Sequence, residues 1–187
     1  MSLPKKTVLS LNDGRWGLKR ARRTARAIGS DRRAVRSLVD SMFGDDVELR
    51  KRAADVARRI TEVDAAPLMR HADELAGLLA DVSVEESRTR WHLGLVVAHV
   101  AHTREQRLRA ARLMQVLMED ESNVARCSAV EGIGLLAADE PSLRSLAEEM
   151  IARALREGTL AMKCRARNMK RLLERRTKAA GDADAVR

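Results

Sequence analysis

A short pattern that returns at a nearly constant interval constrains this chain more than any other feature. Each copy has a basic residue and, three positions later, a residue of the kind found in protein cores. The basic positions are Arg50, Arg88, Arg126 and Lys163, spaced by 38, 38 and 37 residues, and the core-type positions are Ala53, Trp91, Ala129 and Ala166. A steady period of this length is typical of proteins built from stacked helical units.

Composition and hydrophobic periodicity assign these units to the helical class. Aromatic residues make up 2% of the chain and tyrosine is absent, which argues against a β-sandwich or a β-barrel. In residues 47–60 the apolar side chains recur at the spacing of one helix face, at Leu49, Ala53, Val56, Ala57 and Ile60. The sequence therefore predicts an all-α fold with no β-sheet.

The helical segments are predicted to come in pairs. They are Arg15–Ile28, Asp31–Phe43, Val47–Ile60, Pro67–Ala80, Val84–Val100, Arg104–Met118, Ser122–Ala137, Pro141–Arg156 and Thr159–Arg175. Gly29 and Gly44 are expected to end the first two segments. Residues 1–13 are interpreted as an N-terminal extension, residues 14–176 as a single domain and residues 177–187 as a polar tail that frays.

Within the units an acidic residue, an apolar–basic pair and two small or apolar residues follow one another in a fixed order. The order is present in Asp45, Leu49, Arg50, Ala53 and Val56, and again in Glu121, Ala125, Arg126, Ala129 and Gly132. It resembles the HEAT repeat, and residues 90–93 and 158–167 are also similar to short bacterial HEAT-repeat proteins. The resemblance covers about residues 15–175. It implies a right-handed α-solenoid of about four to five helix pairs, with the second helices on the concave side.

Charge divides the chain into two basic ends and an acidic middle. The net charge is +9 over residues 1–60, −6 over residues 61–160 and +6 over residues 161–187. On the first predicted helix, Leu18, Ala21, Ala25 and Ile28 form an inward stripe. The basic residues of the outward face, with those that extend it onto the next helix, are Arg15, Lys19, Arg22, Arg23, Arg26, Arg32, Arg33 and Arg36. A surface of one charge sign predicts an anionic partner.

Two functions agree with this charge pattern, and neither is catalytic. The favoured one is an interaction scaffold that binds an acidic protein surface, because few aromatic side chains are present to stack on single-stranded nucleic acid. The alternative is a nucleic-acid-binding module whose basic N- and C-terminal units contact phosphates. The sequence has no phosphate-binding loop, nucleophile elbow or dinucleotide fingerprint, so we expect no enzyme activity and no cofactor.

The histidines and cysteines predict neither a metal site nor a disulfide. His92 and His99 share a helix face with Glu85, but seven residues of helix separate the two imidazoles by about 10.5 Å, too far for one ion. Cys127 and Cys164 hold equivalent positions in adjacent units, which are about 8–10 Å apart, beyond the reach of a bridge. Free thiols and the lack of a membrane-spanning apolar run favour a cytoplasmic protein without a membrane partner.

The repeated residues themselves are interpreted as structural. We expect the basic positions Arg50, Arg88, Arg126 and Lys163 to bridge neighbouring units through acidic residues rather than to bind phosphates. Trp91 is expected to be a buried core residue, with Gly94 making room for its ring. The alternative for Trp91 is an exposed aromatic side chain that stacks on a base.

Overall fold

The chain is helical in a computed structural model that describes Leu11 and residues 14–185, with side chains to residue 179. Its helices are α2 (Leu18–Ile28), α3 (Arg32–Phe43), α4 (Val47–Thr61), α5 (Ala66–Met69), α6 (Ala72–Asp81), α7 (Ser87–Val100), α8 (Arg104–Met118), α9 (Asn123–Asp139), η1 (Pro141–Leu143), α10 (Arg144–Glu157) and α11 (Leu160–Ala185). No strand occurs among these residues, so the prediction of an all-α fold is confirmed. The predicted N-terminal extension, apart from Leu11, lies outside the described residues.

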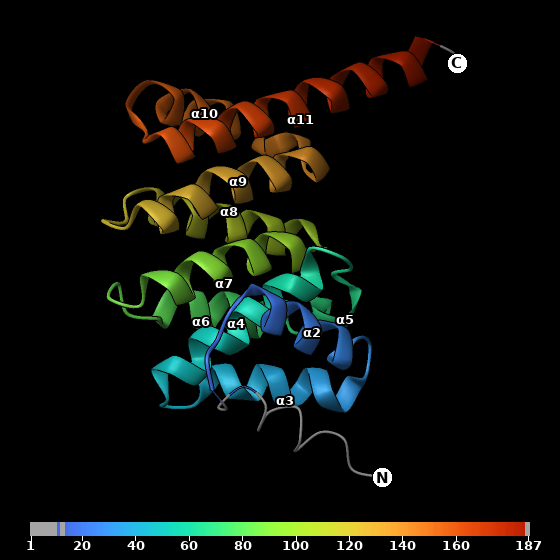
Figure 1. Ribbon diagram of the computed structural model, residues 1–187. Coiled ribbons are helices and arrows are strands. Elements are labelled where there is room, and N and C mark those ends of the chain that lie inside the picture. Colours follow the sequence, from blue (N-terminus) through green and yellow to red (C-terminus); the bar gives the residue numbers. More distant parts are fainter. Residues whose placement is uncertain (1–10, 12–13, 186–187) are drawn as a thin grey trace.

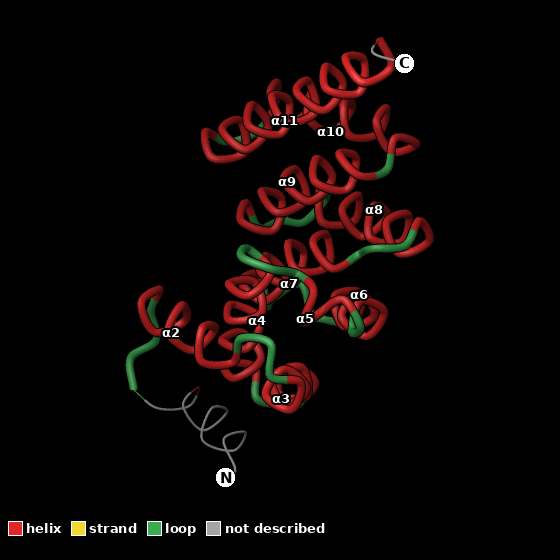
Figure 2. The backbone as a smooth tube through the Cα atoms, turned by 90° about the vertical axis from the view of Figure 1, so that its right-hand side faces the viewer, coloured by secondary structure: helices red, strands yellow, loops and turns green. Residues whose placement is uncertain are grey.

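From α3 onward the helices are stacked one above another in chain order, whereas α2 lies above α3 and packs on α4 (Figure 1). Two rows run side by side along the stack (Figure 2). One row contains α4, α7, α9 and α11, which we call the first-helix layer, and the other contains α3, α6, α8 and α10. Each member of the first-helix layer packs extensively on the next, whereas in the other row the contact of α6 with α8 is much smaller. Packing within a row is therefore most extensive in the first-helix layer, and second helices also pack on the first helix that follows, as α8 does on α9.

The register of the repeat is set by position within each first helix. The fourth residue of these helices is Arg50, Arg90, Arg126 or Lys163, and the residue three positions later is Ala53, Leu93, Ala129 or Ala166. All four of the latter are fully buried. The sequence alignment of Arg88 and Trp91 with this series is therefore off by two residues. A constant interval along the chain misses the shift because the connection before α7 is longer than the others.

Glycines allow two pairs of first helices to approach closely. A Cβ atom at Gly94 of α7 would lie 2.8 Å from the Ser128 Oγ of α9, and a Cβ at Gly134 of α9 would lie 2.6 Å from the Cβ of Met169 in α11. Gly94 thus makes room for a neighbouring helix and not for the Trp91 ring, contrary to the prediction. At these two positions the absence of a side chain lets the neighbouring helices pack closely.

Several helix ends differ from those predicted. The segment expected from Pro67 to Ala80 is divided into α5 and α6, because His71 leaves helical geometry with φ −104° and ψ 11°. The segment that begins at Pro141 opens with the short helix η1 before α10. At the C-terminus α11 continues to Ala185, so the predicted frayed tail is mostly helical. No described helix is both long and apolar enough to cross a membrane.

The first helix is shorter than predicted. It begins at Leu18, because Gly17 is extended with φ −173° and ψ 171°, and it ends at Gly29, whose φ of +50° is the left-handed geometry that favours glycine. Leu18 is 49% exposed and so lies outside the predicted inward stripe. Thr24 is buried instead, with the other three predicted members of the stripe.

Candidate functional site

The predicted basic residues form one exposed surface at the N-terminal end of the stack. Arg15 precedes α2, α2 contributes Lys19, Arg22, Arg23 and Arg26, and α3 contributes Arg32, Arg33 and Arg36. We call this set the N-terminal basic surface. Every member is exposed. The prediction that these side chains face outward therefore agrees with their exposure in the structure.

Only one member of the N-terminal basic surface has a carboxylate partner in the described part of the chain. The Arg36 guanidinium lies 2.7 Å from the Asp40 carboxylate and 3.2 Å from that of Glu74. Within the described residues the other members have no carboxylate oxygen within 4.0 Å. Carboxylates of the described residues therefore leave most of this group of like charges unpaired.

The position of α2 is set by its contact with α4. Ala21 is fully buried and Ile28 is 3% exposed, which turns one face of α2 toward α4 and the basic face outward. Just before α2, the Trp16 indole N–H donates to the Asp55 Oδ2 of α4 at 3.1 Å. The Arg52 guanidinium, also from α4, lies 5.7 Å from the centre of the Trp16 ring. These contacts hold the basic surface against the rest of the stack.

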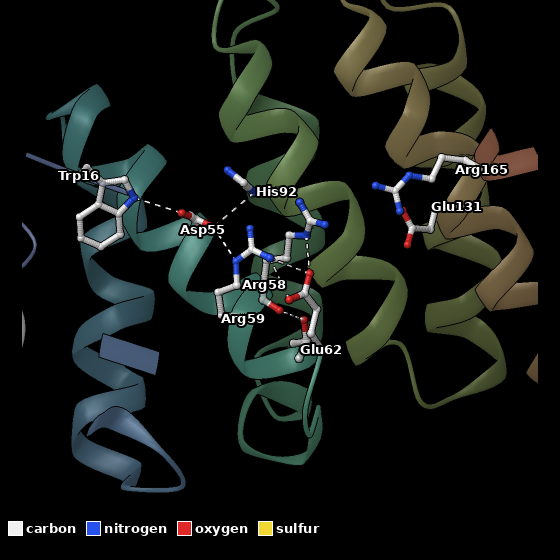
Figure 3. A network of polar contacts seen from close by, with 9 residues as sticks. Trp16, Asp55, Arg58, Arg59, Glu62, His92, Glu131 and Arg165 are labelled. Atoms are coloured by element: carbon white, nitrogen blue, oxygen red, sulfur yellow. Dashed lines mark hydrogen bonds and ion pairs between the residues drawn. The ribbon is translucent and has the colours of Figure 1, made fainter. Parts of the chain in front are cut away.

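Asp55 is the centre of a polar network that sequence reasoning missed. Figure 3 shows its carboxylate between Trp16, Arg59 and His92. It accepts from Arg59 Nε at 3.0 Å, and its Oδ1 lies 4.0 Å from the His92 Nδ1. Asp55 is 8% exposed. The available signal was a single carboxylate within a run of alanine and valine on one helix, since a buried carboxylate needs partners.

Trp91 lies beside this network rather than in the core. Its ring is half-buried, with the Arg58 guanidinium 4.6 Å from the ring centre and the His92 ring stacked on it at 4.5 Å. The prediction that Trp91 is a buried core residue is wrong because Leu93 takes that position in the helix register. Two side chains already lie against the ring, which also argues against stacking on a base.

The two histidines of α7 are poor bases in this environment. Burial lowers the pKa of His92 to about 4, with Arg58 and its neighbours acting in the same direction and Asp55 opposing them. Burial also lowers the pKa of His99. Glu85 is exposed. In the described part of the chain no three His, Cys, Asp or Glu side chains gather where they could hold a metal ion.

The repeated arginines contact neighbouring units at two positions. Arg50 donates to the Met42 carbonyl at 3.0 Å and pairs with Glu86 at the head of α7. Arg90 donates to the Val82 carbonyl at 2.9 Å and pairs with Asp120, before α9, at 2.8 Å. Each arginine thus joins the end of the preceding helix to an acidic residue of the next unit. We call these two contacts the seam pairs.

The remaining repeat positions make no such pair. Arg88 is exposed. Arg126 bonds within its own helix, to the Asn123 Oδ1 at 2.6 Å. Lys163 has no carboxylate within 4.0 Å in the part of the chain that the structure describes. Sequence reasoning therefore found the Arg50 seam position and missed that of Arg90.

Both cysteines are free thiols in the structure. Cys127 of α9 is 8% exposed, and burial raises the pKa of its thiol. Cys164 of α11 is exposed. Neither the raised pKa nor the position of Cys127 favours nucleophilic chemistry at that residue.

Comparison with known proteins adds no further constraint: a scan of protein-family models and a search of curated proteins found no match to this chain.

Proposed function

We propose that the chain is a right-handed α-solenoid of HEAT-like helix pairs, and that it works as a non-catalytic scaffold whose N-terminal basic surface binds an acidic protein. The resemblance in sequence, the stacking of helices in chain order and the recurrence of a basic residue at the fourth position of each first helix support the solenoid. Function rests on the basic surface and not on the fold, because one fold serves many functions.

The observation that carries the proposal is the contrast between paired and unpaired cations. The seam pairs bring Arg50 and Arg90 to carboxylates of the next unit. Among the described residues, Lys19, Arg22, Arg23 and Arg26 of α2 have none within 4.0 Å. An end unit of a stack needs a polar outer face but not one charge sign. An uncompensated group of cations is therefore better explained by an anionic partner.

The direction of curvature belongs to this proposal as well. In a curved stack the inner row has its helices closer together than the outer row. The first-helix layer is the more closely packed row, which supports an inner position for α4, α7, α9 and α11. This is the reverse of the arrangement that the HEAT resemblance implies, in which the second helices line the concave side.

Binding to an acidic polypeptide tests the proposal. We expect polyglutamate to bind at low salt and to bind at least tenfold more weakly when Arg22, Arg23 and Arg26 are replaced together by Ala. The matched control replaces Arg104, Arg112 and Arg156 by Ala, three exposed arginines of the acidic middle, and should change affinity less than threefold. Equal loss in both triple variants, or no loss in the first, would contradict the proposal.

Nucleic acid is the second candidate because the last helix is basic too. Within the described residues several cations of α11 have no carboxylate within 4.0 Å, namely Lys163, Arg167, Lys170, Arg171, Arg175 and Lys178. If duplex DNA binds through about six phosphates, the log–log salt slope should be near −5. The Arg22, Arg23 and Arg26 triple variant should then reduce the magnitude of that slope by about 3, from near −5 to near −2. Tight DNA binding at about 150 mM salt that is lost in this variant would favour the nucleic-acid function.

A further inference from the structure

A groove runs along α2 on the side that faces the end of α4. Its volume is about 490 Å³. It is lined by Arg22, Ala25 and Arg26 of α2, by Gly29 and Ser30 of the following loop, and by Arg59, Ile60, Glu62, Val63, Asp64 and Pro67. Grooves of this size hold several side chains or a small ligand.

Apolar and cationic side chains meet in this groove. Ile60 is 6% exposed, whereas Val63 is 89% exposed and is the most exposed large apolar side chain in the described part of the chain. Arg22 and Arg26 stand on the α2 wall without a carboxylate within 4.0 Å among the described residues. Arg59 on the opposite wall is held by Asp55 at 3.0 Å and Glu62 at 2.9 Å. The free cations thus lie on one wall, beside an exposed valine.

A second hollow continues the groove between α3 and α5. Its volume is about 500 Å³, and it shares Ser30, Asp64 and Pro67 with the first. It adds two further cations, Arg32 and Arg70, which are exposed and have no carboxylate within 4.0 Å in the described residues. The two hollows form one trough with unpaired arginines along its length.

Two hydrogen bonds from backbone N–H groups to aspartate side chains hold the loops at the walls of the trough. The Asp31 Oδ1 accepts from the Ala34 N–H at 2.7 Å and caps α3, next to the Gly29 turn. On the other side the Asp64 Oδ1 accepts from the Ala66 N–H at 2.9 Å, where α5 begins. Loops that such hydrogen bonds already hold do not need to be ordered on binding, which lowers the entropic cost of occupying the trough.

We propose that this trough is the docking site for an acidic peptide segment of the partner, with an apolar side chain against Ile60, Val63 and Pro67. Carboxylates of the segment face Arg22, Arg26, Arg32 and Arg70. The inference rests on the proposed function and specifies which part of the basic surface the partner occupies. The positive charge of the unpaired arginines complements acidic side chains, and the valine rim complements an apolar one.

A peptide fits this trough better than a nucleic acid does. Glu62 and Asp64 line it, and Asp64, which has no cation within 4.0 Å among the described residues, would repel a continuous phosphate backbone. A peptide can instead point backbone N–H groups at those carboxylates. The exposed Val63 has no role in phosphate contacts, but it contributes to binding when an apolar side chain covers it.

Two charge-reversal pairs distinguish docking in the trough from diffuse attraction. The first variant is Arg22→Glu with Arg26→Glu, which lie on the trough wall, and the control is Arg23→Glu with Arg33→Glu, which are exposed and do not line it. With a labelled peptide that alternates glutamate pairs and leucine, we expect at least a tenfold loss of affinity in the first and less than a threefold loss in the control. Equal losses would overturn the trough but leave the proposed function standing. No loss in either would overturn both.

A second arm tests the apolar contact. Val63→Ser should weaken binding of the leucine-containing peptide about fivefold and leave binding of polyglutamate unchanged. Val116→Ser on α8, a 61% exposed valine far from the trough in sequence, is the control and should change neither. A loss that is the same for both peptides would contradict an apolar contact at Val63. Duplex DNA that competes with the peptide and binds equally to wild type and the first charge-reversal variant would overturn peptide docking in the trough.

Discussion

Arginines serve opposite purposes at the seams between units and at the N-terminal basic surface. Arg90 is 6% exposed and lies against the Asp120 carboxylate, whereas Arg22 and Arg26 are exposed and have no such partner in the described residues. A buried guanidinium is tolerated only when it is paired and hydrogen-bonded. An exposed group of like charges does not stabilise the fold, because repulsion among the charges lowers the free energy of unfolding. The difference separates arginines that the fold requires from arginines that are available to a partner.

The largest effect is expected when a seam pair is broken. Asp120→Ala removes the partner of buried Arg90 and the acceptor of the Ser122 N–H at 2.8 Å. Leaving an unpaired charge inside the protein should lower the free energy of unfolding by about 3–5 kcal/mol. Urea denaturation followed by circular dichroism measures this loss.

The residue before Asp120 provides a matched control. Glu119 also pairs with an arginine of another unit, Arg153, but both side chains are exposed. Because solvent screens such a pair, Glu119→Ala should leave the urea midpoint close to that of wild type. If both substitutions destabilise the protein equally, burial does not distinguish the seam pairs.

The next largest effect is expected in the pH dependence of stability, through His92 in the first-helix layer. His92 has a pKa of about 4 in the folded protein against about 6.5 in the unfolded chain, so the unfolded chain binds the proton first. Above pH 6.5 the buried neutral imidazole contributes its full share of the free energy of unfolding, about 3 kcal/mol. This share is lost as the pH falls from 6.5 through 4.

A variant isolates this contribution from other titrating groups. His92→Gln keeps a polar side chain of similar size that does not titrate. Its free energy of unfolding should fall less than that of wild type between pH 7 and pH 4. Parallel pH profiles for the two proteins would show that His92 is not buried in the neutral form.

A smaller loss of stability is expected at Trp91, because its side chain is neither fully buried nor fully exposed. Its ring is half-buried against Arg58 and His92, so Trp91→Ala removes these contacts without opening a core cavity. We expect a loss of about 1–2 kcal/mol, below the roughly 3–5 kcal/mol of a buried tryptophan. Leu93→Ala, two residues later and fully buried, should cost more than Trp91→Ala. A larger loss for Trp91→Ala than for Leu93→Ala would indicate that Trp91 is a core residue after all.

The sequence predicted the helices because their apolar spacing is a local property. The paired segments and the outward face of α2 could be read from positions three and four residues apart. The position of the repeat residues within α7 could not be predicted in this way. The constant interval does not reveal that the connection between α6 and α7 is longer than the others. For that reason Arg90 and Leu93, rather than Arg88 and Trp91, occupy the repeat positions.

The trough and the polar network lay beyond sequence reasoning for a different reason. Both arise where segments that are far apart in the chain meet. Trp16 and Asp55 are 39 residues apart and nevertheless share a hydrogen bond. The identity of the exposed cations was predictable from a run of basic residues, whereas the apolar rim at Val63 required the three-dimensional structure.

The smallest change in stability is expected when cations of the N-terminal basic surface are removed. This change tests most directly whether these cations serve binding while the seam arginines serve folding. The measurement is the free energy of unfolding of the Arg22, Arg23 and Arg26 triple alanine variant, by urea denaturation at low salt. We expect a value within about 0.5 kcal/mol of wild type. A loss of more than about 2 kcal/mol, comparable to that expected for a core or seam substitution, would contradict this expectation.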